Sequence, residues 1–137
     1  MKLPEVLLDT DILSALMRKH PVALVNAKRY LAVHQKLTFS IITRYEILRG
    51  LRAKRATTQA TVFEHLCQTS HVLPIDDLII VRASDIYADL HQRGVLISDA
   101  DILIAASAMV RDIAVITNNE AHFSRIPQLR IRNWLQP

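Results

Sequence analysis

Short apolar runs alternate with longer amphipathic stretches along the chain. Helical periodicity in the longer stretches predicts helices at about residues 12–17, 22–35, 43–53, 57–67, 78–92 and 101–110. The short runs predict strands, and they are EVLLD (5–9), LTFSI (37–41), VLPI (72–75), IAVIT (113–117) and LRIRNW (129–134). Because these strands alternate with helices and are apolar on both faces, we expect an α/β fold with a mostly parallel central sheet of about five strands, covered by helices on both sides.

The length and composition narrow this expectation. A chain of 137 residues predicts one domain over residues 1–137 with a sizeable core. Gly50 and Gly94 are the only glycines, which argues against an all-β fold with many tight turns. The single cysteine, Cys67, excludes disulfides within the chain, so we expect a reducing, cytoplasmic location. The N-terminal sequence resembles neither a signal peptide nor a membrane span, and we expect no membrane contact.

Acidic and amide side chains follow the predicted strands. In parallel sheets, ligands bind outside the carboxyl ends of the strands, so these positions are the candidates for a functional site. They are Asp9 and Asp11 after the first strand, Glu46 after the second, Asp99 and Asp101 at the start of the last long helix, and Asn118 and Asn119 after the fourth strand.

Helix capping offers another explanation for each acid. Ser98 with Asp101, and Thr43 with Glu46, have the spacing of a capping box, which contributes ~1 kcal/mol. For Asp11 we prefer a place in the first turn of a helix, where the macrodipole favours a negative charge. Capping does not explain why several acids should gather at one edge of a sheet. That convergence favours a hard divalent cation such as Mg²⁺ or Mn²⁺, which takes oxygen ligands.

The other chemistry-bearing residues give weaker signals. The six histidines are scattered without zinc-site spacing, and we expect surface or packing roles for them. Lys and Arg number 17 against 13 Asp and Glu, a net charge of +4 that suits a polyanionic partner. Arg49, Arg52 and Arg55 recur at every third position, which predicts one helix flank. That flank is either a solvated surface or a contact for RNA phosphates.

The order of four segments closely resembles that of PIN-domain ribonucleases, specifically the VapC-type toxins of bacterial toxin–antitoxin (VapBC) systems. The segments are LLDTDILSAL, TRYEILRGL, GVLISDADILIAASA and VITNNEAHFSRIPQLRIRNW, and together they span nearly the whole chain. The resemblance implies a PIN-like α/β/α sandwich. It also implies a Mg²⁺- or Mn²⁺-dependent endoribonuclease, in which metal-activated water cleaves RNA and leaves 5′-phosphate and 3′-hydroxyl ends.

The resemblance also assigns roles by position. Asp9, Glu46 and Asp101 match the acidic triad of the family and would be both the catalytic residues and the metal ligands. The fourth acidic position of many members falls on Asn119 here, a departure that lowers the charge of the site. Asp99 is a secondary ligand that could supply the missing charge. Three further positions would orient the ligands or the substrate, namely Thr10, Thr117 and Asp11.

Partners and rival functions complete the expectations. The resemblance implies an RNA substrate, with tRNA the favoured class, a homodimer, and a VapB-type antitoxin whose arginine reaches the acids. The apolar residues Ile47, Leu48 and Leu51 belong either to that interface or to the core. One rival is a PIN-like module that binds RNA or a partner without cleaving, which Asn119 favours. The other is a haloacid-dehalogenase-like phosphotransferase with Asp9 as nucleophile, which the lack of a lysine after Lys54 opposes.

Overall fold

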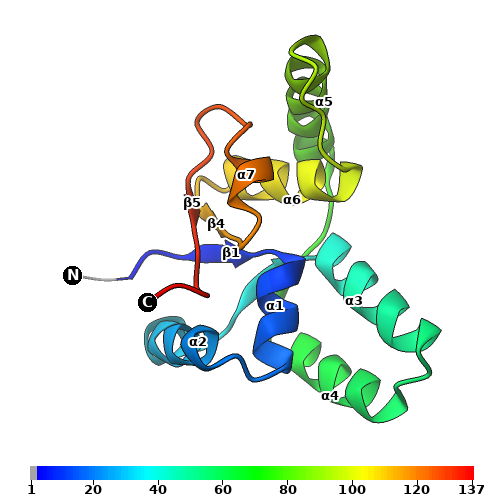
Figure 1. Cartoon of the computed structure of the whole chain (residues 1–137), viewed down its shortest axis with the longest axis vertical. Coiled ribbons are helices and arrows are strands. Elements are labelled where there is room, and N and C mark those ends of the chain that lie inside the picture. Colours follow the sequence, from blue (N-terminus) through cyan, green and yellow to red (C-terminus); the bar gives the residue numbers. More distant parts are fainter. Residues whose placement is uncertain (1–2) are drawn as a thin grey trace.

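The computed structural model describes residues 3–137, and in this range the strands form one sheet that is parallel throughout. The strand order is β3-β2-β1-β4-β5 (Figure 1). The strands are β1 (Val6–Leu8), β2 (Thr38–Ser40), β3 (His71–Leu73), β4 (Ala114–Ile116) and β5 (Ile131–Arg132).

Helices connect the strands and cover the two faces of the sheet (Figure 1). Within residues 3–137 they are α1 (Thr10–Met17), α2 (Pro21–His34), α3 (Ile41–Ala53), α4 (Thr57–Gln68), α5 (Asp77–Gln92), α6 (Asp99–Val110) and the short α7 (Glu120–Phe123). None of the helices described is long and apolar enough to cross a membrane.

Two hydrophobic cores lie on opposite faces of the sheet. Successive strand residues point to opposite faces, so Leu8 joins the core beneath α1 to α4, while Leu7 joins the core beneath α5 and α6. Phe39 and Phe63 anchor the first core, with ring centroids 6.4 Å apart. Phe123 of α7 is buried in the second core. The expected α/β/α sandwich is therefore confirmed, and its sheet is wholly rather than mostly parallel.

The strand order places a topological switch point beside β1. The chain builds outward from β1 through β2 to β3, then crosses to the other side of β1 to form β4 and β5. Leu8 accordingly pairs with Phe39 of β2 on one side and with Ile116 of β4 on the other. Ligands in open parallel sheets bind at such a reversal, outside the carboxyl ends of the strands. Here those ends lead directly into Asp9 and Thr117.

The boundaries of the strands and of three helices differ from the predicted ones. Each strand is only two or three residues long, and α1, α3 and α6 begin two residues before the apolar periodicity suggested. The side chain of Ser40, not Thr43, caps α3 by accepting a hydrogen bond from the backbone N–H of Ile42. The capping-box prediction for Thr43 and Glu46 is therefore wrong, because both residues lie within the helix. The helix α7 was not predicted.

Candidate functional site: an acidic cluster at the carboxyl edge of the sheet

Asp9 lies at the centre of the candidate site, directly after β1. It is the N-cap of α1, and its carboxylate accepts a hydrogen bond of 2.9 Å from the backbone N–H of Ile12. The residue is only 3% exposed. Burial raises the pKa of Asp9 to about 7; the hydrogen bond with Thr117 opposes this rise, and the charges of Asp11 and Asp101 add to it. A carboxyl group this deeply buried favours a neutral or cation-bound state.

Glu46 reaches the same edge from α3. Its Oε1 accepts a hydrogen bond of 2.6 Å from the hydroxyl of Thr10, which is the first residue of α1. The Thr10 hydroxyl also lies 3.0 Å from the hydroxyl of Thr43, one helical turn before Glu46. On its outer side, Glu46 Oε2 lies 3.7 Å from the guanidinium of Arg49. The start of α1 therefore fixes the orientation of an acid on a different helix.

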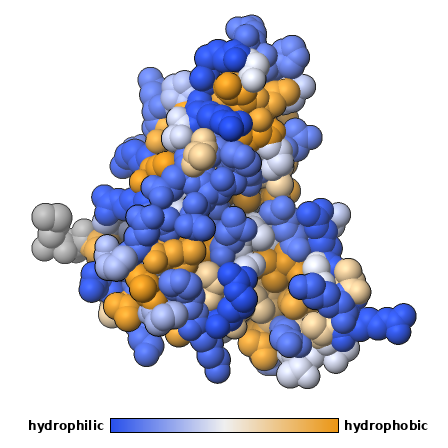
Figure 2. All heavy atoms as spheres, in the orientation of Figure 1, coloured by the Kyte–Doolittle hydropathy of each residue, from blue (hydrophilic) through white to orange (hydrophobic). Residues whose placement is uncertain are grey.

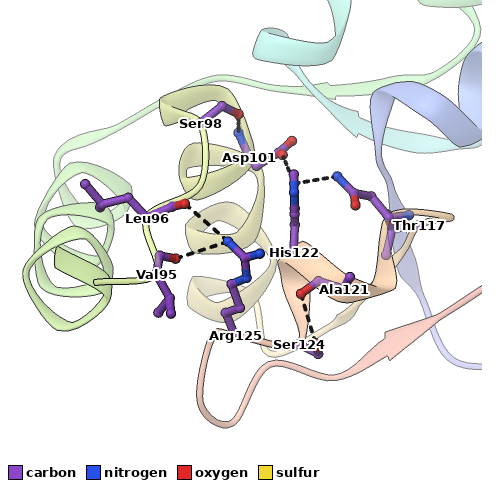
Figure 3. Close-up of polar contacts among 10 residues, drawn as sticks. Val95, Leu96, Ser98, Asp101, Thr117, Ala121, His122, Ser124 and Arg125 are labelled. Carbon is purple, nitrogen blue, oxygen red and sulfur yellow. Dashed lines mark hydrogen bonds and ion pairs between the residues drawn. The ribbon is translucent and has the colours of Figure 1, made fainter. Parts of the chain in front are cut away.

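Asp101 comes from the first turn of α6. The hydroxyl of Ser98 accepts a hydrogen bond of 3.2 Å from the backbone N–H of Asp101, so the predicted cap at Ser98 is present. Figure 3 shows His122 pointing at Asp101, with Nδ1 at 3.8 Å from Oδ2. Burial raises the pKa of Asp101, the charge of Glu46 raises it further, and the hydrogen bond from Ser98 and the nearby His122 lower it.

The segment after β4 completes the site. Thr117 is fully buried, and its hydroxyl accepts a hydrogen bond of 2.8 Å from the backbone N–H of Asn119 while it contacts Asp9. The amide nitrogen of Asn119 lies 2.8 Å from Nδ1 of His122. Asn119 therefore contacts His122, which in turn lies near Asp101. Thr117 contacts Asp9, the most buried acid.

Asp11 and Asp99 occupy different environments. Asp11 is exposed in the first turn of α1, as predicted, but its charge raises the pKa of both Asp9 and Asp101. Asp99 is exposed at the start of α6, and its side chain makes no hydrogen bond or ion pair within residues 3–137. The charge of Asp11, rather than that of Asp99, acts on Asp9 and Asp101.

The chemistry of these donors suits a hard divalent cation. No three His, Cys, Asp or Glu side chains in residues 3–137 stand close enough together to form a ready-made metal cage. Mg²⁺ does not need one, because proteins usually hold it with one or two carboxylates, waters and substrate phosphates. Asp9 and Asp101 offer such oxygen ligands, and in both the burial that raises the pKa is a penalty on the ionised form that a bound cation would offset.

The three candidate RNA-binding arginines are all exposed beyond Glu46. Arg49 and Arg52 lie on α3, as predicted, and the guanidinium of Arg49 lies 5.1 Å from the ring centroid of Tyr45. Arg55 lies past the end of α3 with φ of +55°, so its predicted place on the same helix flank is wrong. Arg49 and Arg52 therefore extend along α3 away from the acidic edge, and Arg55 does not continue this row.

A groove of about 390 Å³ runs from Glu46 between α1 and α3 toward α4. Thr10 and Glu46 line one end, and Ile47 and Leu51 line its apolar wall. Ile47 is buried in the core, whereas Leu51 is half-buried and Leu48 packs against the same core. These apolar residues of α3 thus serve the core and, in part, an accessible groove.

The sequence did not assign two residues to the site: His122, which approaches Asp101, and Thr43, whose hydroxyl contacts Thr10. His122 was expected to have a surface or packing role, and Thr43 was interpreted as a cap. The spacing of Asn119 and His122, three residues apart after a buried strand, is a signal that could have pointed to the histidine. No comparable signal marks Thr43, because its contact with Thr10 depends on how α1 packs against α3.

Comparisons with known proteins agree with this arrangement. The PIN domain family model matches residues 6–129. The ribonuclease VapC1 of Methanocaldococcus jannaschii is 29% identical over 93% of this chain and 85% of its own length. The tRNA(fMet)-specific endonuclease VapC of Salmonella typhimurium is 31% identical over 72% of this chain and 76% of its own length. A crystal structure of VapBC2 from Rickettsia felis bound to a promoter DNA fragment superimposes with a TM-score of 0.85 at 25% identity, covering 96% of this chain and 99% of that one.

The chain therefore belongs to the PIN-domain family. Within that family its curated relatives are ribonucleases of the VapC type. This membership decides against the haloacid-dehalogenase-like alternative, in which Asp9 would be a nucleophile.

Proposed function

We propose that this protein is a metal-dependent endoribonuclease toxin of the VapC type, built as a single PIN domain. The observation that carries the proposal is the convergence of Asp9, Glu46 and Asp101 from three different helices, with Asp9 buried and its pKa raised to about 7. The ribonuclease names of the VapC relatives support the same activity. The cytoplasmic location that the lone Cys67 predicts is part of the proposal.

Asp9, Asp101 and Glu46 would hold Mg²⁺ or Mn²⁺, with Asp99 and Asn119 as secondary ligands. When bound, such a cation lowers the pKa of water and neutralises charge that develops on the scissile phosphate. The side chains of this chain supply the positioning. Thr117 supports the Asp9 carboxylate, and Thr10 fixes Glu46. No side-chain nucleophile is required for this hydrolysis, because water attacks in line with the leaving oxygen.

We further propose tRNA as the substrate class. A relative that is 31% identical is named a tRNA(fMet)-specific endonuclease. The exposed Arg49 and Arg52 extend from the acidic edge along α3, where they suit contacts to successive RNA phosphates.

A VapB-type antitoxin is the proposed protein partner. The structural relatives include VapBC complexes from Rickettsia felis and Salmonella typhimurium. The groove between α1 and α3 opens at Glu46, so a bound antitoxin segment could place an arginine on the acids. Such an arginine would pair with a carboxylate in bidentate geometry and replace the charge of the cation.

The homodimer remains part of the proposal, and we place its contact on α5. Leu78 and Val81 on this helix are 67% and 54% exposed. Figure 2 shows apolar side chains gathered on the protruding α5. An exposed apolar face of this kind is typical of a protein contact surface.

A cleavage assay tests the proposed activity. Purified protein is incubated with labelled total tRNA in Mg²⁺, in Mn²⁺ or in EDTA, beside Asp9→Asn and Asp101→Asn variants. Asp85→Asn serves as a matched control, since Asp85 is an exposed acid on α5. We expect the native protein to cleave tRNA with either metal. The cleavage rate should fall by at least about a hundredfold in each site variant and stay unchanged in the control. Cleavage that survives EDTA or both site variants would overturn the mechanism, and binding without any cleavage would favour the non-cleaving module.

A further inference from the structure

A second cavity, of about 260 Å³, lies between the N-terminal segment, α2 and the C-terminal tail. Its apolar lining includes Val6 and Ile116 from the sheet, together with Tyr30 and Trp134. The two aromatic ring centroids are 5.7 Å apart. The amide of Asn26 donates a hydrogen bond of 3.0 Å to the backbone carbonyl of Trp134, which ties the tail to α2 (Figure 1). The cavity thus has a defined aromatic wall.

Both charged side chains in the lining are cationic. Arg29 of α2 and Arg132 of β5 line the cavity, and no Asp or Glu does. Neither guanidinium makes a hydrogen bond or ion pair within residues 3–137. By contrast, Arg111 pairs with Glu5 at 3.2 Å and Arg130 with Asp112 at 3.0 Å. Two unpaired guanidinium groups beside an aromatic wall favour an anionic ligand with a flat apolar part.

The cavity is connected to the acidic cluster through β5. The backbone N–H of Thr117 donates a hydrogen bond of 2.8 Å to the carbonyl of Arg132. The side chain of Asn133 donates to Asn118 at 3.0 Å, next to the residues that support Asp9 and Asp101. Arg132 and Trp134 are therefore at most one residue away along the chain from residues that bond to Thr117 and Asn118. An RNA strand bound at the acids could continue along β5 to the cavity.

We propose that this cavity binds one nucleotide of the RNA substrate, beyond the scissile phosphate. The inference rests on the proposed ribonuclease function and deepens it. Trp134 offers a surface for base stacking, while Arg29 and Arg132 contact the flanking phosphates. The volume of about 260 Å³ suits one base, with its sugar and phosphates outside at the exposed arginines. A duplex does not fit, so the site would take single-stranded or splayed-out RNA.

Trp134 gives a direct test, because it is the only tryptophan of the chain. Its fluorescence is followed while a short single-stranded RNA is added to the Asp9→Asn protein in EDTA, where cleavage cannot interfere. We expect saturable quenching. Arg29→Ala and Arg132→Ala should each raise the Kd about tenfold and lower the salt slope of binding by about 0.7. Arg82→Ala, the loss of an exposed arginine on α5, should leave the Kd unchanged.

The outcomes separate this site from the proposed activity. Unchanged Trp134 fluorescence on RNA binding, with the same Kd in the Arg29→Ala/Arg132→Ala double variant, would overturn the nucleotide site even if the native protein cleaves RNA. Quenching and arginine dependence without cleavage by the native protein would support the site and count against the ribonuclease. A double variant that binds RNA normally but no longer retains a VapB-type antitoxin would make the cavity a protein contact, and the inference would be wrong.

Discussion

The hydroxyl of Thr10 donates a hydrogen bond of 2.6 Å to Glu46 Oε1, and it thereby joins the start of α1 to the second turn of α3. Thr10 directly follows Asp9, so one dipeptide supplies both a buried acid and the group that orients a second acid. The hydroxyl of Thr43 lies 3.0 Å away and completes the contact from within α3. The distance between the two carboxylates is therefore set by helix packing as well as by the strand ends.

Replacing Thr10 by Val is expected to lower RNA cleavage about 10–100-fold, because Glu46 loses the hydroxyl that orients it. The free energy of unfolding should fall by about 1–2 kcal/mol, since the Thr43 hydroxyl also loses its partner. Thr10→Ser keeps the hydroxyl and should retain most of the activity. Cleavage rates and urea denaturation of the two variants check this, and equal activity in Val and Ser variants would contradict it.

The fold was predictable because its signals are local. Alternating strand and helix patterns imply parallel connections, and parallel strands bring their carboxyl ends to one edge. The placement of Asp9 and Asp101 follows from this geometry, and the cap at Ser98 follows from the local spacing of Ser98 and Asp101. The strand lengths did not follow, because buried runs such as IAVIT continue beyond the residues that pair in the sheet. An apolar run in the sequence indicates which residues are buried. Only some of these residues form the backbone hydrogen bonds of the sheet.

The remaining parts of the site depend on contacts between elements. Thr43 was interpreted as a cap because it precedes Glu46 by three residues, but Ser40 starts the helix and leaves Thr43 facing Thr10. His122 approaches Asp101 only because α7 packs beside α6, and α7 is too short to give a periodic signal. Side-chain pairs from segments distant in sequence carry no local pattern.

Asp9→Asn is expected to stabilise the metal-free protein at pH 8. The pKa of Asp9 is about 7 in the folded chain, whereas its ordinary value is 3.8. Between pH 4 and pH 7 the folded state therefore keeps a proton on Asp9 that the unfolded chain has released. Stability of the native protein therefore falls as the pH rises through this window, and the full penalty is present above pH 7. Asparagine removes the penalty and still caps α1.

The stability gain of Asp9→Asn should reach up to about 4 kcal/mol at pH 8 and disappear near pH 4. Urea denaturation in EDTA at both pH values measures it, and the difference between the two proteins isolates Asp9 from other titrating groups. Adding Mg²⁺ at pH 8 should stabilise the native protein more than the variant. A variant that is equally stable or less stable at pH 8 would show that burial does not penalise the Asp9 carboxylate.

The apolar face of α5 should control self-association. Leu78→Asp combined with Val81→Asp places charge on an exposed apolar surface, and a two-fold interface would contain each substitution twice. We expect the dimer to weaken by at least about a hundredfold. Val62→Asp on α4 is the matched control, because Val62 is 59% exposed on another helix. Light scattering after size-exclusion chromatography measures the masses, and an unchanged dimer in the α5 variant would place the contact elsewhere.

Asn119→Asp should strengthen the dependence of the site on its cation. The substitution places a fourth carboxylate beside His122, which lies 3.8 Å from Asp101. Added negative charge at the acidic edge raises the affinity for a divalent cation, and we expect the Mn²⁺ concentration for half-maximal cleavage to fall about threefold to tenfold. Asp99→Asn, which removes an exposed acid, should shift the same concentration far less. Metal titrations of tRNA cleavage compare the two variants, and a larger shift for Asp99→Asn would make Asp99, rather than position 119, the auxiliary ligand.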